Sequence, residues 1–185
     1  DPNAGHQMMP SLAIAPDDSL HLIWRDQRAI SQELRDAMPA NADLFASDLV
    51  DGAWTEPVPV GTRLEDDINA GWPHLAVDGD RLVAVWSVYK GTTPQDMLTA
   101  TRVDWSTRPV ADPVGWSTPA PLIEPDDRDV GGRQIELKTD PTGGVMLLYS
   151  RYYPTSLDMY LRKLPAGSNE WGEDLAVSSG DFGYL

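Results

Sequence analysis

One pattern of residues occurs three times along this chain at nearly constant spacing. An alternating apolar run ends in an aromatic residue at Trp24, Trp86 and Tyr149, which are 62 and 63 residues apart. Because a repeated unit of this size must bury its apolar face on neighbouring copies, the repeat predicts the architecture before any site can be discussed. After each aromatic residue come a segment that begins with Asp and a segment that begins with Trp: Asp43, Asp96 and Asp158, then Trp54, Trp116 and Trp171.

Each copy is predicted to hold four short antiparallel strands joined by tight turns. Asp51-Gly52, between two apolar runs, is a strong hairpin signal. Four such strands in one repeat are typical of a β-propeller blade. The predicted strands are 9–15, 20–25, 43–49 and 54–60 in the first copy, 74–77, 82–88, 96–103 and 119–123 in the second, and 134–138, 145–151, 158–164 and 174–177 in the third.

The predicted fold is therefore all-β, with three propeller blades at residues 1–66, 67–128 and 129–185. Two insertions lengthen the repeats: residues 27–42, where ISQELRDAM predicts a short helix, and residues 104–115, which would extend a hairpin of the second blade. Because propellers typically close with about 4–8 blades, three blades would make half of a six-bladed ring. The remaining blades would lie in cis or on a second copy, and the sequence favours a longer polypeptide.

Composition limits the partners that such a chain can have. The net charge of -15 argues against nucleic acid and against anionic membranes. No apolar run approaches the length of a membrane span, so no membrane insertion is expected. With no cysteine and no motif for a cofactor, we predict no cofactor, although the Asp-rich turns at 17–18, 78–80 and 126–129 could bind Ca²⁺. The expected compartment is extracellular or periplasmic.

Two stretches of the chain resemble known propeller repeats. Residues 42–82 resemble the TolB-type repeats of bacterial envelope proteins, through an Asp-led strand, an Asp-Gly turn, Trp-Thr-x-Pro and an Asn-containing linker. Residues 10–28, read with 47–54, resemble the Asp-box repeats of the sialidase-like superfamily. That box reads Ser-x-Asp-x-Gly-x-x-Trp; Ser47, Gly52 and Trp54 match it, whereas the Asp stands next to the Gly, at Asp51.

The resemblance to sialidases implies an arginine cluster, a Tyr nucleophile activated by a Glu, and an acidic proton donor. At the positions that match the first arginine of the family, the chain reads Met8-Met9-Pro10 and Gly71-Trp72-Pro73, and Arg133 in the third repeat lacks the following Pro. The catalytic residues are therefore left unassigned. The candidate ligand-binding residues follow the second strand of each blade or lie in the linkers between blades: Arg25, Asp26, Arg28, Tyr89, Arg128, Arg133, Arg151, Tyr152 and Tyr153.

Three functions remain open from the sequence. The preferred hypothesis is a binding or assembly module that recognises a glycan or a protein partner and is non-catalytic in this segment. The alternatives are a sialidase-like glycoside hydrolase whose other catalytic residues lie in further blades, and a structural subunit of an envelope assembly. The motif WRDQR at residues 24–28 could hold a ligand, but a local Arg–Asp ion pair at the strand end is its simpler interpretation. The recurring Trp and Asp residues are expected to be structural.

Overall fold

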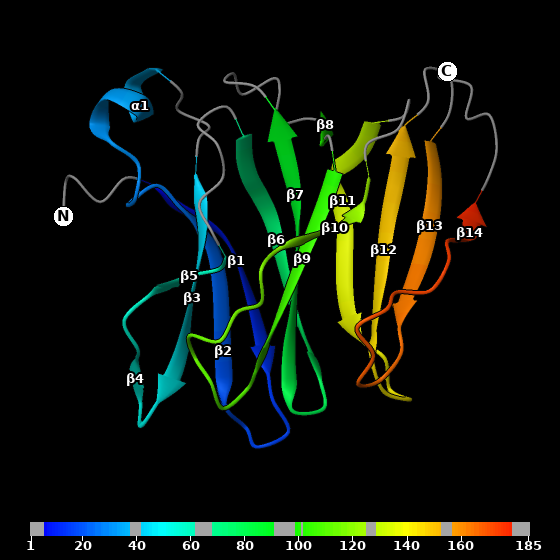
Figure 1. Cartoon of the computed structure of the whole chain (residues 1–185), viewed down its shortest axis with the longest axis horizontal. Coiled ribbons are helices and arrows are strands. Elements are labelled where there is room, and N and C mark those ends of the chain that lie inside the picture. The colour runs from blue at the N-terminus through cyan, green and yellow to red at the C-terminus, as the bar shows by residue number, and fades with distance from the viewer. Residues whose placement is uncertain are drawn as a thin grey trace.

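The computed structural model of the chain describes residues 6–37, 42–61, 68–90, 99–100, 102–124, 129–152 and 157–178. The described strands form three antiparallel sheets that stand side by side (Figure 1). Each sheet is built around four strands in sequence order, as a propeller blade requires. The predicted all-β propeller architecture with three blades is confirmed.

The first blade contains β1 (Gln7–Ile14), β2 (Leu20–Asp26) and β3 (Asp43–Val50), followed by an outer strand in two pieces, β4 (Ala53–Trp54) and β5 (Val58–Pro59). The Asp-Gly hairpin forms as predicted, because Asp51 and Gly52 both adopt the positive φ angles of a tight two-residue turn. Between β2 and β3 lies the predicted short helix, α1 (Gln32–Ala37).

The second and third blades repeat this order. The second blade consists of β6 (Ile68–Asp78), β7 (Arg81–Lys90), β9 (Arg102–Pro109) and β10 (Ala120–Ile123). The third consists of β11 (Asp129–Thr139), β12 (Val145–Tyr152), β13 (Leu157–Leu164) and β14 (Leu175–Ser178). A short strand, β8 (Thr99–Ala100), precedes β9 in the chain but pairs with β11 of the third blade.

One predicted strand of the second blade is wrong. The sequence suggested a strand from Asp96 to Val103, followed by a long hairpin, whereas the third strand is β9, which pairs with β7 over residues 102–109. In β9 the side chains of Val103 and Trp105 pack in the core between the second and third blades, and this burial favours residues 102–109 as the strand. Asp96 itself lies outside the described residues, and Arg102 occupies the strand position of Asp43 and Asp158.

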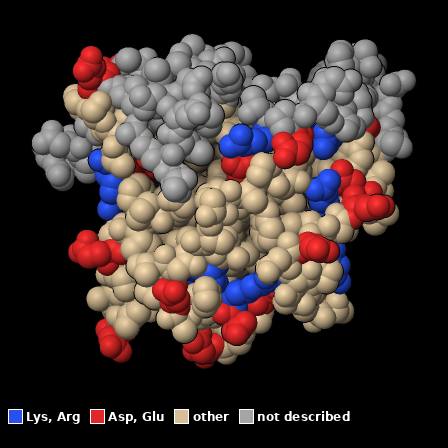
Figure 2. Space-filling view, in the orientation of Figure 1, with Lys and Arg blue, Asp and Glu red and all other residues tan. Residues whose placement is uncertain are grey.

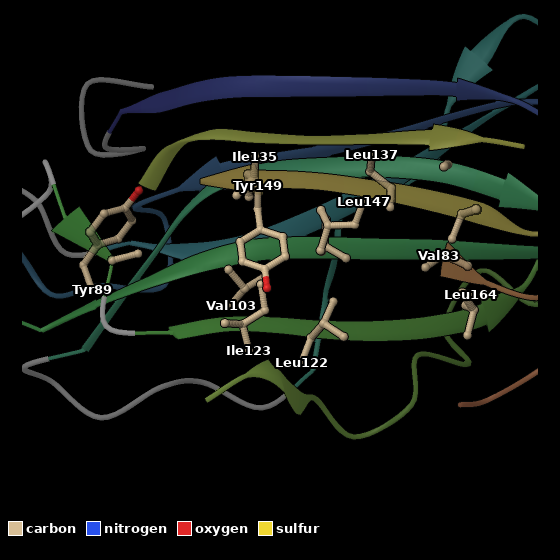
Figure 3. Packing of buried hydrophobic residues seen from close by; sticks show 14 residues of the cluster. Val83, Tyr89, Val103, Leu122, Ile123, Ile135, Leu137, Leu147, Tyr149 and Leu164 are labelled. Atoms are coloured by element: carbon tan, nitrogen blue, oxygen red, sulfur yellow. The ribbon is translucent and has the colours of Figure 1, made fainter. Parts of the chain in front are cut away.

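Two apolar cores hold the blades together, one at each junction. The first blade packs on the second through Ile23, Leu44, Leu75 and Trp86 with their neighbours. The second packs on the third around Tyr149, which Figure 3 shows pointing between the strands toward Val103 and Ile123. Trp24, Trp86 and Tyr149 do recur at one strand position, as the repeat predicted, and each is buried. The first strands of the blades, β1, β6 and β11, lie next to one another.

A buried polar network also joins the first two blades, at the end where β1 turns into β2. Arg108 of β9 reaches across the junction and forms an ion pair with Asp48 of β3. The same carboxylate lies 2.7 Å from Nδ1 of His21, and Nε2 of His21 lies 2.8 Å from the Ser19 hydroxyl. Charged residues of both signs gather at this lower edge of the molecule (Figure 2). The junction therefore rests on a buried ion pair as well as on apolar contact.

The first strand of each blade carries a β-bulge near its start. In β1 and β6 the bulged residue precedes a proline and has a left-handed backbone, with φ 57° at Met9 and 50° at Trp72. Residues other than glycine rarely adopt this conformation, and bulges often lie beside binding sites, where they redirect side chains. In β11 the bulge is longer and spans the position of Arg133. The positions that the sialidase resemblance associates with arginine therefore lie in these bulges.

Candidate functional site

The site candidates that the structure describes lie at one common edge of the sheets. Here β2, β7 and β12 end, and β1, β6 and β11 begin, because the second strand of each blade runs antiparallel to the first. We call this edge the loop face; α1 lies there, at the top of Figure 1. In propellers the strand-connecting loops at one end present the ligand-binding groups. The charged groups on this edge are therefore the first to consider.

Arg25 lies beneath the loop face and is almost fully buried, with an exposed fraction of 2%. Its Nε donates a hydrogen bond to the carbonyl oxygen of Ala70 in the neighbouring blade (2.9 Å), and its Nη1 lies 3.1 Å from Sδ of Met8. Among the residues that the structure describes, Nη2 has no hydrogen-bond partner. Burial lowers the pKa of Arg25 to about 10, and the nearby Tyr89 partly offsets this effect. The structure thus brings together two predicted site residues, Arg25 and Tyr89.

Asp26 and Arg28 form a local pair that holds the end of β2. The buried Asp26 carboxylate accepts hydrogen bonds from the Trp24 indole (2.7 Å), the Arg28 backbone N–H (2.7 Å) and Arg28 Nε (2.8 Å). The Arg28 guanidinium in turn lies over the ring of Phe45, 5.1 Å from its centroid. These hydrogen bonds hold the Asp26 carboxylate within the first blade. This agrees with a local ion pair at the end of β2.

Arg151 is the remaining predicted residue whose side chain is described. It is buried at the end of β12, with its guanidinium carbon 5.8 Å from the ring centroid of Tyr149. Burial, reinforced by the carboxylate of Asp174, raises the pKa of Tyr149 to about 12. Arg133 and Tyr152 lie within β11 and β12, but their side chains are outside the described part of the structure. Arg128 and Tyr153 lie outside the described residues altogether.

Sequence reasoning missed a second buried carboxylate, Asp104 of β9. Arg102 binds it through two hydrogen bonds, from Nε (2.8 Å) and from Nη2 (3.0 Å). Burial raises the pKa of Asp104 above its ordinary value, against the opposing effect of Arg102. The alternating Arg-Val-Asp pattern places both side chains on one side of β9 and could have revealed the pair. It was overlooked because the strand was expected to end at Val103.

Beside these residues, an apolar pocket opens between the first two blades. Its cavity volume is about 260 Å³, and Leu44, Val60 and Trp86 form part of its wall. Asp43 contributes the only carboxylate among the described lining residues. The pocket lies on the loop face, since Asp43 begins β3 and Ala70 lies near the start of β6. Its described lining is Ala29, Asp43, Leu44, Phe45, Pro59, Val60, Gly61, Ala70, Trp86 and Pro119.

The shape of this pocket depends on the close approach of Gly61 to Pro119. Gly61 has φ 83°, and a Cβ added there would lie 2.3 Å from Cγ of Pro119. We therefore expect Gly61→Ala to destabilise the fold by about 1–2 kcal/mol through its left-handed backbone, and further because the proline ring must move. Gly52→Ala is the matched control, because Gly52 has φ 80° and open space around its Cα. Equal losses of unfolding free energy in urea titrations would contradict the proposed clash.

Metal ligands and membrane-spanning helices are the remaining features to consider in the described residues. No group of three or more His, Cys, Asp or Glu side chains in this part of the chain is placed to hold a metal ion. Asp17 and Asp80 belong to two of the Asp-rich turns that could bind Ca²⁺. Both line a second pocket, at the opposite end of the first two blades. Among the described residues, no helix has the length and apolar character needed to cross a membrane.

Comparison with known proteins gives matches in structure alone. No protein-family model matches the sequence, and no curated protein matches it. Among solved structures, the chain is similar to the Hadza microbial sialidase Hz136, with a TM-score of 0.65 and 12% identity over 89% of this chain and 36% of that one. It is similar to the Trypanosoma rangeli sialidase in complex with 2,3-difluorosialic acid, with a TM-score of 0.60 and 10% identity over 91% and 30% of the two chains.

A third similar structure is the Penicillium chrysogenum α-L-arabinanase complexed with arabinobiose, with a TM-score of 0.56 and 16% identity over 93% of this chain and 51% of that one. The chain thus spans about a third to a half of the length of these structures. At such low identity the likeness establishes the fold, which different activities share. The chain has the β-propeller fold that is found in sialidases and other glycoside hydrolases.

Proposed function

We propose that the three blades belong to a secreted or periplasmic carbohydrate-binding propeller, which holds a sugar ring in the pocket between the first two blades. The observation that carries this proposal is the pocket itself, an apolar recess of about 260 Å³ on the loop face with a carboxylate in its lining. Binding sites for small ligands are concave and mainly apolar, with a few polar groups that fix orientation. The apolar wall would contact the C–H face of a sugar, and Asp43 would accept hydrogen bonds from its hydroxyl groups.

The described charged residues favour binding over catalysis by these blades. Asp26 is held by Trp24 and Arg28, and Asp104 is held by both nitrogens of Arg102. A general acid or nucleophile must be able to approach the substrate, whereas these carboxylates are buried in pairs within the blades. Asp26 holds the end of β2, and Asp104 holds the start of β9.

The second candidate is a glycoside hydrolase whose catalytic groups lie outside the described residues. It is favoured by the likeness to sialidases and to an arabinanase, and by the fact that the chain spans only part of those proteins. Fluorogenic sialosides and arabinofuranosides distinguish the two candidates. Hydrolysis of either substrate by the purified chain, lost on heat denaturation, would replace the binding proposal by the enzymatic one.

The pocket can be blocked without disturbing the core, since Ala29 lies in its lining and is exposed. We expect Ala29→Trp to weaken binding of the recognised sugar at least tenfold while leaving the melting temperature unchanged. The matched control is Ala111→Trp, an exposed alanine that lines the pocket at the opposite end. Isothermal titration calorimetry with arabinobiose, β-1,3-galactotriose and 3′-sialyllactose measures the effect. The proposal fails if the unmodified chain binds none of the three, or if Ala29→Trp binds as tightly.

A further inference from the structure

Three side chains of the first blade form a line of hydrogen bonds far from the loop face. They lie at the opposite edge, where β1 turns into β2 (Figure 1). Ser19 Oγ lies 2.8 Å from Nε2 of His21, and Nδ1 of His21 lies 2.7 Å from Oδ1 of Asp48. We infer that Ser19 is a nucleophile that His21 activates and Asp48 helps to position, and that the second pocket beside it binds a small neutral ester, which the protein hydrolyses.

The order of these groups meets the geometric requirement for an activated serine. A hydroxyl becomes nucleophilic when a base within about 2.6–3.2 Å can take its proton and a third group orients that base. A neutral imidazole that donates from Nδ1 to Asp48 presents the lone pair of Nε2 to the Ser19 hydroxyl. Such an arrangement of Ser, His and Asp is recognised by its geometry and occurs on unrelated folds.

The base is held firmly, whereas the nucleophile can be reached from solvent. His21 is 2% exposed and Asp48 is 7% exposed, and Arg108 binds the same oxygen of Asp48 that faces His21. Ser19 is partly exposed, in the turn between β1 and β2. Packing and a further hydrogen bond around a functional group keep it in its productive orientation. The imidazole is therefore fixed toward a hydroxyl that a substrate can approach.

Asp17 is a second acceptor for the Ser19 hydroxyl. Its Oδ1 lies 2.5 Å from Ser19 Oγ and accepts a hydrogen bond from the Ser19 backbone N–H at 3.1 Å. These two hydrogen bonds, the side-chain one first, lower the pKa of Asp17 below its ordinary value. A carboxylate with a lowered pKa is a weak base, so the proton that Ser19 loses on attack passes to His21. Asp17 holds the turn and competes with His21 for the hydroxyl in the resting protein.

The second pocket provides space for a substrate beside this turn. Its cavity volume is about 310 Å³, and residues 15–17, 79–80 and 109–111 line it. Asp17, which holds Ser19, is part of this lining. The wall is mainly alanine, proline and valine, and the carboxylates of Asp17 and Asp80 would repel an anion. The pocket therefore favours a small neutral acyl group over a negatively charged one.

The reaction that these groups support is transfer of the acyl group to the serine and then to water. Ser19 Oγ forms a bond to the carbonyl carbon of the ester while its proton moves to Nε2 of His21. The bond from that carbon to the alcohol oxygen breaks, and the alcohol leaves with the proton from His21. Water then attacks the acyl-serine, His21 takes the proton of the water, and this proton returns to Ser19 Oγ as the acid leaves.

The experiment labels the full chain with a fluorophosphonate, which forms an Oγ–P bond with loss of fluoride, and locates the label by peptide mass spectrometry. We expect the label on Ser19 and hydrolysis of p-nitrophenyl acetate above the buffer rate. Ser19→Ala should lose both. Ser168→Ala is the matched control and should lose neither, because Ser168 is also a partly exposed turn serine, but its Oγ donates to the Glu170 carbonyl. An unlabelled Ser19, or turnover that survives in Ser19→Ala, would overturn the inference.

Two further variants test which group is the base. His21→Gln is expected to slow labelling at least tenfold, with a circular dichroism spectrum like that of the unmodified chain as the control for folding. Asp17→Ala is expected to label at least as fast as the unmodified chain, because the hydroxyl is then left to His21. A tenfold loss in Asp17→Ala would make Asp17 the base and would refute the assignment to His21.

The positioning role of Asp48 and the place of the pocket have separate readouts. Asp48→Asn is expected to lower kcat at least tenfold with KM unchanged, a split that loss of the pocket would not give. Ala111→Trp fills the second pocket and should slow ester hydrolysis at least tenfold, whereas Ala29→Trp, on the loop face, should leave it unchanged. Since Ala29→Trp is the variant expected to weaken sugar binding, failure of the esterase leaves the carbohydrate proposal standing, and the reverse. An equal rate in Ala111→Trp and the unmodified chain would exclude the second pocket as the ester site.

Discussion

Replacing Asp48 with alanine is expected to lower the free energy of unfolding by about 3–5 kcal/mol. The loss arises because Arg108 would remain buried without its counter-charge; the Arg108 side chain is 1% exposed and that of Asp48 is 9% exposed. Burial lowers the pKa of Arg108, and Asp48 acts in the opposite direction by favouring the charged guanidinium. The other terminal nitrogen, Nη1, donates to the backbone carbonyl oxygens of Pro109, Val110 and Asp112, and the Asp112 carboxylate adds a smaller attraction than Asp48 does.

Urea unfolding followed by tryptophan fluorescence measures this effect. Glu56→Ala removes an exposed carboxylate from the same blade and serves as the control, with an expected change below about 0.5 kcal/mol. The double variant Asp48→Leu with Arg108→Met removes both charges and is expected to recover much of the loss, because replacing a whole buried pair by apolar residues is often neutral. If Asp48→Ala and Glu56→Ala were equally stable, the ion pair would not support the junction between the first two blades.

The second large effect is expected at the other junction. Tyr149→Ala should lower the free energy of unfolding by about 3–5 kcal/mol, the usual loss when a buried aromatic ring leaves a cavity. Tyr149 is fully buried among residues of the second and third blades (Figure 3). Its ring stacks on that of Tyr160 in the adjacent strand, with centroids 5.6 Å apart. Removing it would therefore loosen the third blade as well as its contact with the second.

Tyr149→Phe separates the ring from the hydroxyl group. It keeps the packing, so its loss is expected to stay within about 1.5 kcal/mol. Hydrogen exchange monitored by mass spectrometry adds a second readout, since Tyr149→Ala should increase exchange in β11–β13 more than in β1–β3. The prediction would be refuted by a uniform increase across all three blades, or by equal losses of stability in the two variants.

Much of the fold could be predicted from the sequence, because each blade uses local rules that repeat. The alternating apolar runs at residues 20–25, 82–88 and 145–151 became the second strands, and the Asp51-Gly52 turn formed where it was expected. The failure at Asp96 has a physical cause. The expected strand ended at Val103, whereas packing of Val103 and Trp105 between the second and third blades favours a strand at residues 102–109.

The candidate site was less predictable, because its residues are used by neighbouring blades. Arg25 and Tyr89 were named from their places at strand ends, but only the junction between blades brings them together beneath the loop face. A local Arg–Asp ion pair was expected within residues 24–28, and the structure assigns it to Asp26 and Arg28. The pocket could not be foreseen, since its wall combines Leu44, Val60, Trp86 and Pro119 from two blades.

The sequence by itself determined the thrice-repeated blade, since strand alternation and turn residues act over a few neighbouring positions. Tertiary structure alone decided which equivalent residues are buried. Leu12, Leu75 and Leu137 occupy the same strand position, yet one is 53% exposed and the others are almost fully covered. The difference arises because burial depends on the surface that packs against a residue. That surface belongs to the adjacent blade, a separate copy of the repeat, so the residues next to Leu75 and Leu137 in the sequence do not reveal it.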